Sequence, residues 1–375
     1  MRVTSLFALG IAGLTLVAAA PAVAQNSGTA VAEVPTRSGL GPVSPADQQV
    51  YKAAATAYKA GDFKDVFRLI KPLAQTGNPV AQYSIGMQYL EGKGVAQDYS
   101  AAALWIRKSA DQGLAEAENR LGELYEDGQG VPQNYAIAAQ WYRKAADQGN
   151  PWAQCHLGQL FEYGQGVAQD YAVAADWYQK SADQGFAGGE YSLGALYLQG
   201  EGVPRDSATA ANWLRKAADQ GDASAQYDLA VQYNHGDGVP QDYAMAAELY
   251  KKAADQGNAL AKYDLGVMYA QGNGVAQDDA VAVAWYRESA DQGLAEAQYN
   301  LAEEYAKGRA GPGDLVQVYK WVSLAVLNAK TPHVRDLATR TRDGIAALMT
   351  KAQIAEADAQ VKAWRPVPAS APEGR

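Results

Sequence analysis

A unit of 36 residues is repeated seven times through the middle of the chain, from Gly77 to Asn328. One series of glycines opens the units, and a second series follows fifteen residues later in each. A single unit of this length cannot bury an apolar face alone, so consecutive units must stack on one another. The opening series is Gly77, Gly113, Gly149, Gly185, Gly221, Gly257 and Gly293, and the second is Gly92, Gly128, Gly164, Gly200, Gly236, Gly272 and Gly308.

The first half of each unit has the pattern of a helix. In the first unit Ala81, Ile85 and Tyr89 are spaced by four residues and fall on one stripe. Asn78 stands at the N-cap position, and Gly92 suits a left-handed helix end. Three units have an apolar residue at the cap position, so we expect their helices to begin less firmly: Leu114, Phe186 and Leu294.

The second half of each unit predicts another helix, which begins after an Asp or Asn N-cap such as Asp98 or Asn134. Small residues at one position of the first helix allow neighbouring helices to approach closely. These two features predict an all-α fold, an α/α solenoid of stacked helical hairpins. The small residues are Gly86, Gly122, Gly158, Gly194, Ala230, Gly266 and Ala302.

The run from Asn258 to Gln292, with A-x-x-x-L-G-x-x-Y-x-x-G-x-G-V-x-x-D and then A-W-Y-R-x-S-A-D-Q, resembles the Sel1-like repeat family, which is related to tetratricopeptide repeats. The resemblance covers all seven units. It implies a right-handed superhelix, with first helices that line a concave surface, in proteins that serve as adaptors for other proteins. The seventh unit departs from the pattern at residues 308–313, so we expect its loop to turn differently.

The N-terminal 24 residues have the pattern of a secretory signal peptide. Arg2 precedes an apolar run from Leu6 to Ala20, and Ala22-Val23-Ala24 forms a cleavage site. An uncleaved signal anchor is the alternative. We therefore expect a periplasmic or secreted protein that begins at Gln25 and has no membrane span in the mature chain.

The remaining segments differ in composition from the repeats. Residues 25–43 are rich in small and polar residues without periodicity, whereas Thr350 and Gln353 have the spacing of a capping box. The resulting division is a signal peptide at 1–24, a flexible leader at 25–43, an N-terminal helical hairpin cap at 44–76, seven repeats at 77–328, C-terminal capping helices at 329–364 and a disordered tail at 365–375.

The composition argues against catalysis and against nucleic acid as a ligand. The formal net charge of −9 does not favour phosphate binding, and one Cys and three His leave little for a metal site. The S-x-x-K, K-T-G, G-x-S-x-G and H-E-x-x-H motifs are absent from the sequence. We therefore predict a protein that is not an enzyme and has no cofactor or metal.

Isolated reactive residues have ordinary structural interpretations. Cys155 is expected to be a packed small side chain, with an intermolecular disulfide or a reactive thiol as the alternative. His156 and His235 are expected to be surface histidines. The recurrent Asp-Gln-Gly segment is expected to organise the turn between units rather than to form a row of functional carboxylates.

We then expect function at positions of the first helices where the residue varies between units, while the residues at the packing positions stay constant. We predict that these form a groove that binds a protein partner, such as an envelope protein or the periplasmic domain of a sensor, through an apolar stripe with a polar rim. The alternatives are a cell-wall factor that binds peptidoglycan fragments or restrains a wall hydrolase, and an unrecognised β-lactamase-like hydrolase. The candidate groove residues are Met87, Gln88, Glu91, Arg120, Glu123, Leu124, His156, Gln159, Leu160, Tyr163, Leu196, Asp228, Val231, Gln232, His235, Asp264, Met268 and Glu303.

Overall fold

Helix caps that recur every 36 residues divide the chain into helical hairpins. The computed structural model describes residues 44–311 and 313–368, and all regular structure in these two ranges is α-helical. The predicted signal peptide (1–24), the leader (25–43) and the end of the predicted tail (369–375) lie outside the described residues. The helices group into two compact units, and we describe residues 44–206 and 207–368 separately.

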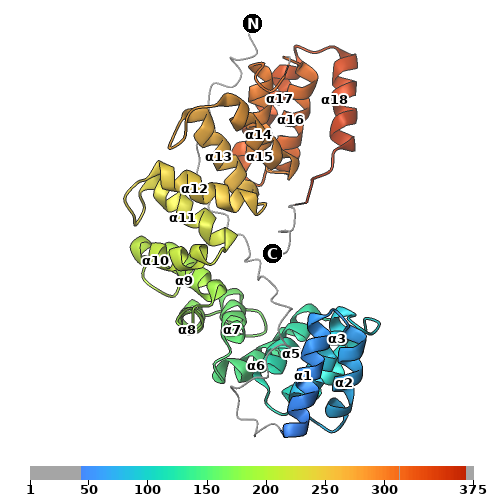
Figure 1. Cartoon of the computed structure of the whole chain (residues 1–375). Helices are drawn as coiled ribbons and strands as arrows, with labels where there is room; N and C mark the ends of the chain where they lie inside the picture. The colour runs from blue at the N-terminus through green and yellow to red at the C-terminus, as the bar shows by residue number, and fades with distance from the viewer. Residues whose placement is uncertain (1–43, 312, 369–375) are drawn as a thin grey trace. The chain divides into compact units, whose positions relative to one another are not determined.

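The N-terminal unit begins with one hairpin that precedes the repeat array. The first three hairpins of the array and the first helix of the fourth follow it. Each helix packs against the next along the chain (Figure 1). Its helices are α1 (Pro45–Lys59), α2 (Phe63–Gln75), α3 (Pro79–Glu91), α4 (Tyr99–Ala110), α5 (Ala115–Asp127), α6 (Tyr135–Asp147), α7 (Pro151–Tyr163), α8 (Tyr171–Ala182) and α9 (Ala187–Gln199).

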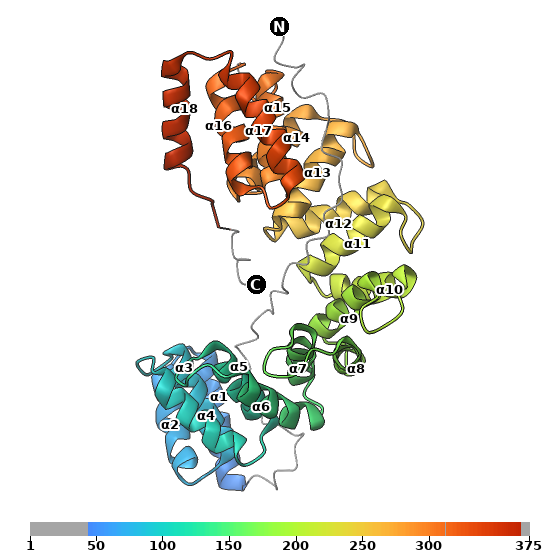
Figure 2. The same cartoon turned by 180° about the vertical axis from the view of Figure 1, so that it is seen from behind.

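The C-terminal unit continues the same alternation and ends in two further helices. Figure 2 shows α16, α17 and α18 from the opposite side, where α18 stands along α16. The helices are α10 (Ser207–Asp219), α11 (Ala223–His235), α12 (Tyr243–Asp255), α13 (Ala259–Gln271), α14 (Asp279–Asp291), α15 (Ala295–Ala306), α16 (Leu315–Asn328), α17 (Pro332–Ala346) and α18 (Lys351–Ala363).

The predicted caps account for where the helices begin. The Asn78 side chain accepts from the backbone N–H of Ala81, and the Asp98 side chain accepts from that of Ala101. Helices α5, α9 and α15 have no side-chain cap, as expected from Leu114, Phe186 and Leu294. The Thr350 capping box also forms, with Gln353.

The loop inside five of the repeat hairpins is stabilised by a glutamine. The Gln97 Nε2 donates to the carbonyl of Leu90 at 2.8 Å and lies 3.0 Å from the Tyr99 hydroxyl. Gln133, Gln169, Gln241 and Gln277 make the same backbone contact in other hairpins. The seventh hairpin differs as predicted, because α15 ends one residue earlier, with right-handed Lys307 at its C-cap before the left-handed Gly308.

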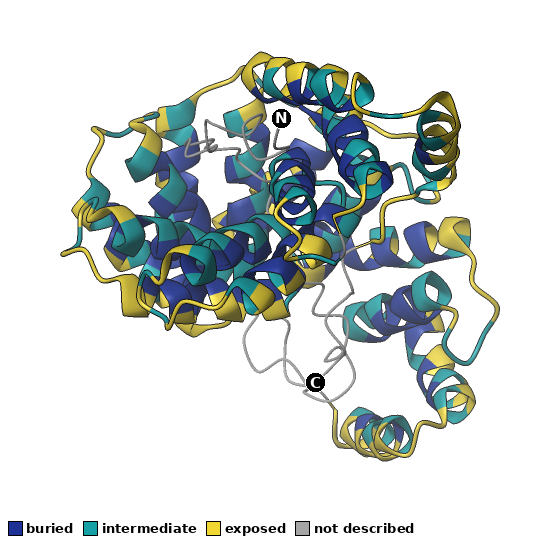
Figure 3. Cartoon of the chain, turned by 90° about the horizontal axis from the view of Figure 1, so that it is seen from above, coloured by how far each residue is buried: buried dark blue, intermediate teal, exposed yellow. Residues whose placement is uncertain are grey.

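The core lies between the helices of successive hairpins, and the exposed residues gather on loops and outer helix faces (Figure 3). Gly122 on α5 illustrates why one position must be small. A Cβ added there would lie 2.6 Å from Cδ1 and Cε1 of the buried Tyr142 ring on α6. The small residue therefore allows the two helices of a hairpin to approach closely.

The last described residues contact the turn between two helices of the repeat array. Beyond α18, the Val367 N–H donates to the Asp291 carbonyl at 2.8 Å. The Trp364 ring lies close to Gly293 in the same turn between α14 and α15. Residues 365–368, which the sequence places in a disordered tail, are thus held against the C-terminal unit by Trp364 and this backbone bond.

Candidate functional site

Seven of the predicted groove residues are buried, which contradicts the expectation of an exposed apolar stripe. Leu160 has no exposed surface, and it belongs to one core cluster together with Leu124 and Trp177. The reason is that a first helix packs against its own second helix and against the second helix of the preceding unit, so a wide arc of its surface is covered. The buried residues are Met87, Gln88, Leu124, Leu160, Leu196, Gln232 and Met268.

The other eleven candidates reach solvent to different extents. Tyr163 and His235 are exposed, and each is the last residue of its helix, α7 or α11. The other nine are half-buried: Glu91, Arg120, Glu123, His156, Gln159, Asp228, Val231, Asp264 and Glu303.

One position in the middle of each first helix carries a polar residue whose type varies among the units. We call the residues at this position the polar row. The serines of the row are buried, whereas its larger members are half-buried. The polar row consists of Ser84, Arg120, His156 and Ser192 in the N-terminal unit, and of Asp228, Asp264 and Asn300 in the C-terminal unit.

In the N-terminal unit Glu123 on α5 joins two members of the polar row. It forms an ion pair with Arg120 on the same helix, and its Oε1 lies 3.6 Å from His156 Nε2 on α7. The Asn119 amide donates to Glu123 at 2.8 Å. Burial alone would raise the pKa of Glu123, but the contact with His156 and the charge of Arg120 outweigh it and lower that pKa.

His156 is not the surface histidine that the sequence suggests. Its ring stacks on that of Tyr142, with centroids 4.9 Å apart and an interplanar angle of 9°. Burial alone would lower the pKa of His156, but Glu123 raises it above the usual value. Both basic members of the N-terminal polar row therefore have an acidic partner in Glu123.

In the C-terminal unit the polar row carries carboxyl groups. The Tyr227 hydroxyl on α11 donates to Asp264 Oδ2 on α13 at 3.1 Å, which links two consecutive first helices. Burial raises the pKa of Asp264 to about 7, although the Tyr227 hydrogen bond acts in the opposite direction.

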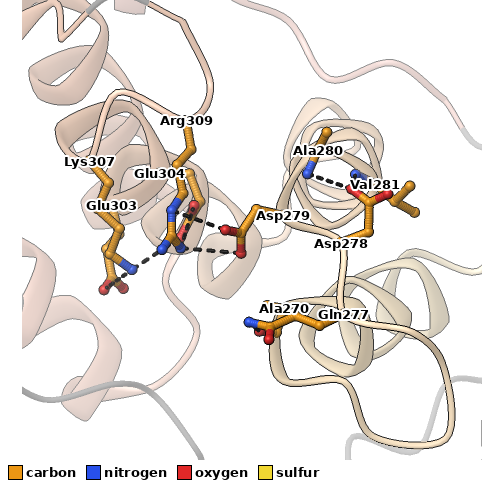
Figure 4. A network of polar contacts seen from close by, with 10 residues as sticks. All are labelled: Ala270, Gln277, Asp278, Asp279, Ala280, Val281, Glu303, Glu304, Lys307 and Arg309. Carbon is orange, nitrogen blue, oxygen red and sulfur yellow. Dashed lines mark hydrogen bonds and ion pairs between the residues drawn. The ribbon is translucent and has the colours of Figure 1, made fainter.

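Glu303 belongs to an ion-pair network beside the altered seventh loop (Figure 4). Lys307 Nζ lies 2.7 Å from Glu303 and 3.1 Å from Glu304, and Arg309 Nε lies 3.2 Å from Asp279. These pairs join α14, α15 and the loop. Lys307 and Arg309, on either side of Gly308, thus anchor the start of the altered loop.

The sequence interpretation missed the residue that precedes the polar row. Most units have a tyrosine there, and in the C-terminal unit Tyr227 contacts the polar row of the next unit. The signal in the sequence was a tyrosine, with both an aromatic ring and a hydroxyl group, that recurs directly before a variable position. This set comprises Tyr83, Tyr191, Tyr227, Tyr263 and Tyr299, with Asn119 and Cys155 in the other two units.

Two further features concern the described residues only. Cys155 is buried, as expected of a packed small side chain. Within residues 44–311 and 313–368 no group of His, Cys, Asp and Glu side chains is placed to hold a metal ion. In the same part of the chain, every helix is too short or too polar to cross a bilayer.

This chain is similar to proteins of solved structure. A Sel1 repeat protein from Oxalobacter formigenes is 32% identical, covers 64% of this chain and 95% of its own, and has a TM-score of 0.59. The uropathogenic Escherichia coli protein c5321, a protective antigen with an SLR fold, is 28% identical over 88% of this chain and 86% of its own, with a TM-score of 0.43. No curated protein matches this chain.

The Sel1 repeat profile matches seven consecutive segments, which together span more than half of the chain. They are residues 79–114, 115–150, 153–186, 187–222, 223–258, 259–294 and 295–327. Each segment begins at or near the start of a first helix and ends close to the following turn. The chain therefore belongs to the Sel1 repeat family.

Proposed function

We propose that this chain is an exported, non-catalytic scaffold of the bacterial cell envelope that binds a protein partner along the first helices of its repeats. Sel1 repeat proteins generally mediate interactions between proteins. The proposal rests on the polar row, where five residue types occur over seven units while the two positions that follow it stay apolar and small. Rigid stacked hairpins can present such a row with a smaller loss of conformational entropy on binding than a flexible segment would have.

Export is supported by the sequence of the first 24 residues. A basic Arg2, an apolar run to Ala20 and the Ala22-Val23-Ala24 site together match a cleaved signal peptide. Purification of the chain from the bacterial envelope should give a protein whose first residue is Gln25. A purified protein that still begins at Met1 would contradict export with cleavage of the signal peptide.

The binding face can be tested by a photoreactive amino acid placed at single positions in living cells. Tyr163 is 51% exposed at the end of a first helix, and Leu104 is 55% exposed on the second helix α4. Both are in the N-terminal unit, so they form a matched pair. We expect one discrete cross-linked protein from position 163 and none from position 104.

Two outcomes would contradict the proposal. Equal cross-linking from positions 163 and 104 would show contact without a preferred face. Attachment of the position 163 variant to purified peptidoglycan, with no protein product, would favour the cell-wall alternative instead.

A further inference from the structure

Asp264 is a half-buried carboxyl group without a basic partner in the described part of the chain. Its one direct polar contact there is the hydrogen bond from the Tyr227 hydroxyl, at 3.1 Å. None of the ion pairs among the described residues includes Asp264, and the charged group that acts on it most is another carboxylate, Glu296 on α15. A buried carboxylate in such a position is unfavourable unless a positive charge is supplied.

Four tyrosines on neighbouring helices interact electrostatically with this carboxyl group. Tyr227 on α11 and Tyr250 on α12 have ring centroids 5.7 Å apart, and Tyr263 on α13 and Tyr286 on α14 have centroids 6.0 Å apart. Tyr250 and Tyr286 are buried, whereas Tyr227 and Tyr263 keep part of their surface open to solvent, as Asp264 does. The electron-rich faces of such rings attract cations.

The N-terminal unit provides an internal comparison at the same position of the repeat. Arg120 and His156 occupy the positions that correspond to Asp264 in earlier units, and Glu123 is placed beside both. There the chain supplies both signs of charge. At Asp264 the chain supplies the carboxylate and the aromatic rings but not the cation.

We propose that Asp264 and the tyrosines around it form a recognition site for a positively charged side chain, lysine or arginine, of the protein partner. This inference rests on the proposed binding function. The incoming cation would form a charge-assisted hydrogen bond with the free lone pairs of Asp264. The Tyr227 hydroxyl holds the carboxyl group in place, and the exposed parts of the Tyr227 and Tyr263 rings flank the cation.

The proposal is tested with fluorescently labelled hexalysine and the mature full chain. Hexalysine acetylated on every side chain is the uncharged control. Asp264→Asn removes the charge but keeps an oxygen that can accept from Tyr227, so the helix contact is retained. Asp358→Asn removes the same charge from an exposed position on α18 and controls for net charge.

We expect hexalysine to bind the wild-type chain and the acetylated peptide to bind much more weakly. Asp264→Asn should weaken hexalysine binding about tenfold or more, whereas Asp358→Asn should change it less than twofold. Tyr227→Phe keeps the ring and removes the hydroxyl, so it should give an intermediate loss. Circular dichroism of each variant verifies that the helices are retained.

Binding should also strengthen between pH 6 and pH 8, because the carboxyl group ionises in this range. The other ionisable groups that face it are Asp228 and Tyr227 on α11, Tyr250 on α12, Tyr263 on α13, Tyr286 on α14 and Glu296 on α15. The tyrosines have raised pKa values and stay neutral there. The Asp264→Asn variant should lose this pH dependence.

Equal losses in Asp264→Asn and Asp358→Asn would overturn the proposal, because attraction would then depend on net charge alone. Absence of hexalysine binding to the wild-type chain would overturn it as well. Both results leave the proposed scaffold function intact if position 163, in the other unit, still cross-links to one protein. Loss of that cross-link with retained hexalysine binding would instead contradict the proposed function.

Discussion

Gln148, in the turn after α6, donates from its Nε2 to Glu118 Oε2 on α5 at 2.6 Å, thirty residues earlier in the same hairpin. The contact recurs in other hairpins, so the turn glutamine fastens the end of the second helix to the first. The residue at the position of Glu118 also bonds to the preceding hairpin. In the next unit it is Gln154, which donates to the carbonyl of Ala146 on α6 at 3.2 Å. The equivalent pairs are Gln112 with Gln82, Gln184 with Gln154, Gln256 with Gln226, and Asn328 with Gln298.

Replacement of Glu118 by Gln should stabilise the protein near neutral pH. Burial raises the pKa of Glu118 in the folded state, even though Lys144 and Gln148 act to lower it. An acid with a raised folded pKa destabilises the fold as pH rises above its unfolded value of about 4.3. We expect Glu118→Gln to raise the free energy of unfolding by about 1 kcal/mol at pH 7 and by less at pH 4, measured in urea. A larger gain at pH 4 than at pH 7 would contradict this explanation.

Replacement of Gly122 by Ala should destabilise the N-terminal unit. The new methyl group would meet the Tyr142 ring, which cannot move away freely because its hydroxyl donates to Glu126 at 2.6 Å. Overpacking of this kind costs about 1–3 kcal/mol. The double variant with Tyr142→Leu should lose less than the sum of the two single variants, because the clash is removed. Strict additivity in urea unfolding would show that the two positions are not in contact.

Leu160 and Tyr163, one turn apart on α7, should respond very differently to a glutamate. Leu160→Glu places a charge in the core and should cost several kcal/mol, enough to unfold the N-terminal unit. Tyr163→Glu changes an exposed residue and should alter stability by about 0.5 kcal/mol or less. Thermal unfolding followed by circular dichroism distinguishes the two. Equal midpoints would place Leu160 on the surface, where the sequence pattern alone had put it.

The stability of the C-terminal unit should fall as pH rises from about 4 to 7. In this range the folded state keeps the proton on Asp264, whose pKa is about 7, while the unfolded chain has released it at about 3.9. The effect is at most about 4 kcal/mol, and partial exposure of Asp264 reduces it. Asp264→Asn should therefore melt at a higher temperature than the wild-type chain at pH 8 and at the same temperature at pH 4. A lower melting temperature for the variant at pH 8 would contradict an uncompensated carboxylate.

Local chemistry explains which features the sequence predicts well. Caps such as Asn78 and Asp98 act within three residues, so their positions can be read along the chain. The small residue at Gly122 is also readable, because it repeats with the period of the units. These features suffice for the solenoid and for most helix starts.

The binding face is harder to predict because it depends on how one hairpin leans on the next. Leu124 and Leu160 occupy a variable position, yet the second helix of the preceding unit is close enough to cover them. The hydrogen bond between Tyr227 and Asp264 likewise joins residues on different hairpins. Helical periodicity gives the direction of a side chain on its own helix but not the distance to the neighbouring one.

The hydrogen bond between Gln148 and Glu118 joins residues thirty positions apart, and this spacing affects how such an array can change in length. Every partner of Gln148 lies within its own 36-residue hairpin, so loss or duplication of one whole unit leaves each remaining pair intact. Deletion of a single residue between Glu118 and Gln148 would instead shift the turn relative to the helix and break the bond. We therefore expect the array to tolerate recombination in steps of one hairpin, so that the number of positions in the polar row can change while the packing of the other hairpins is kept.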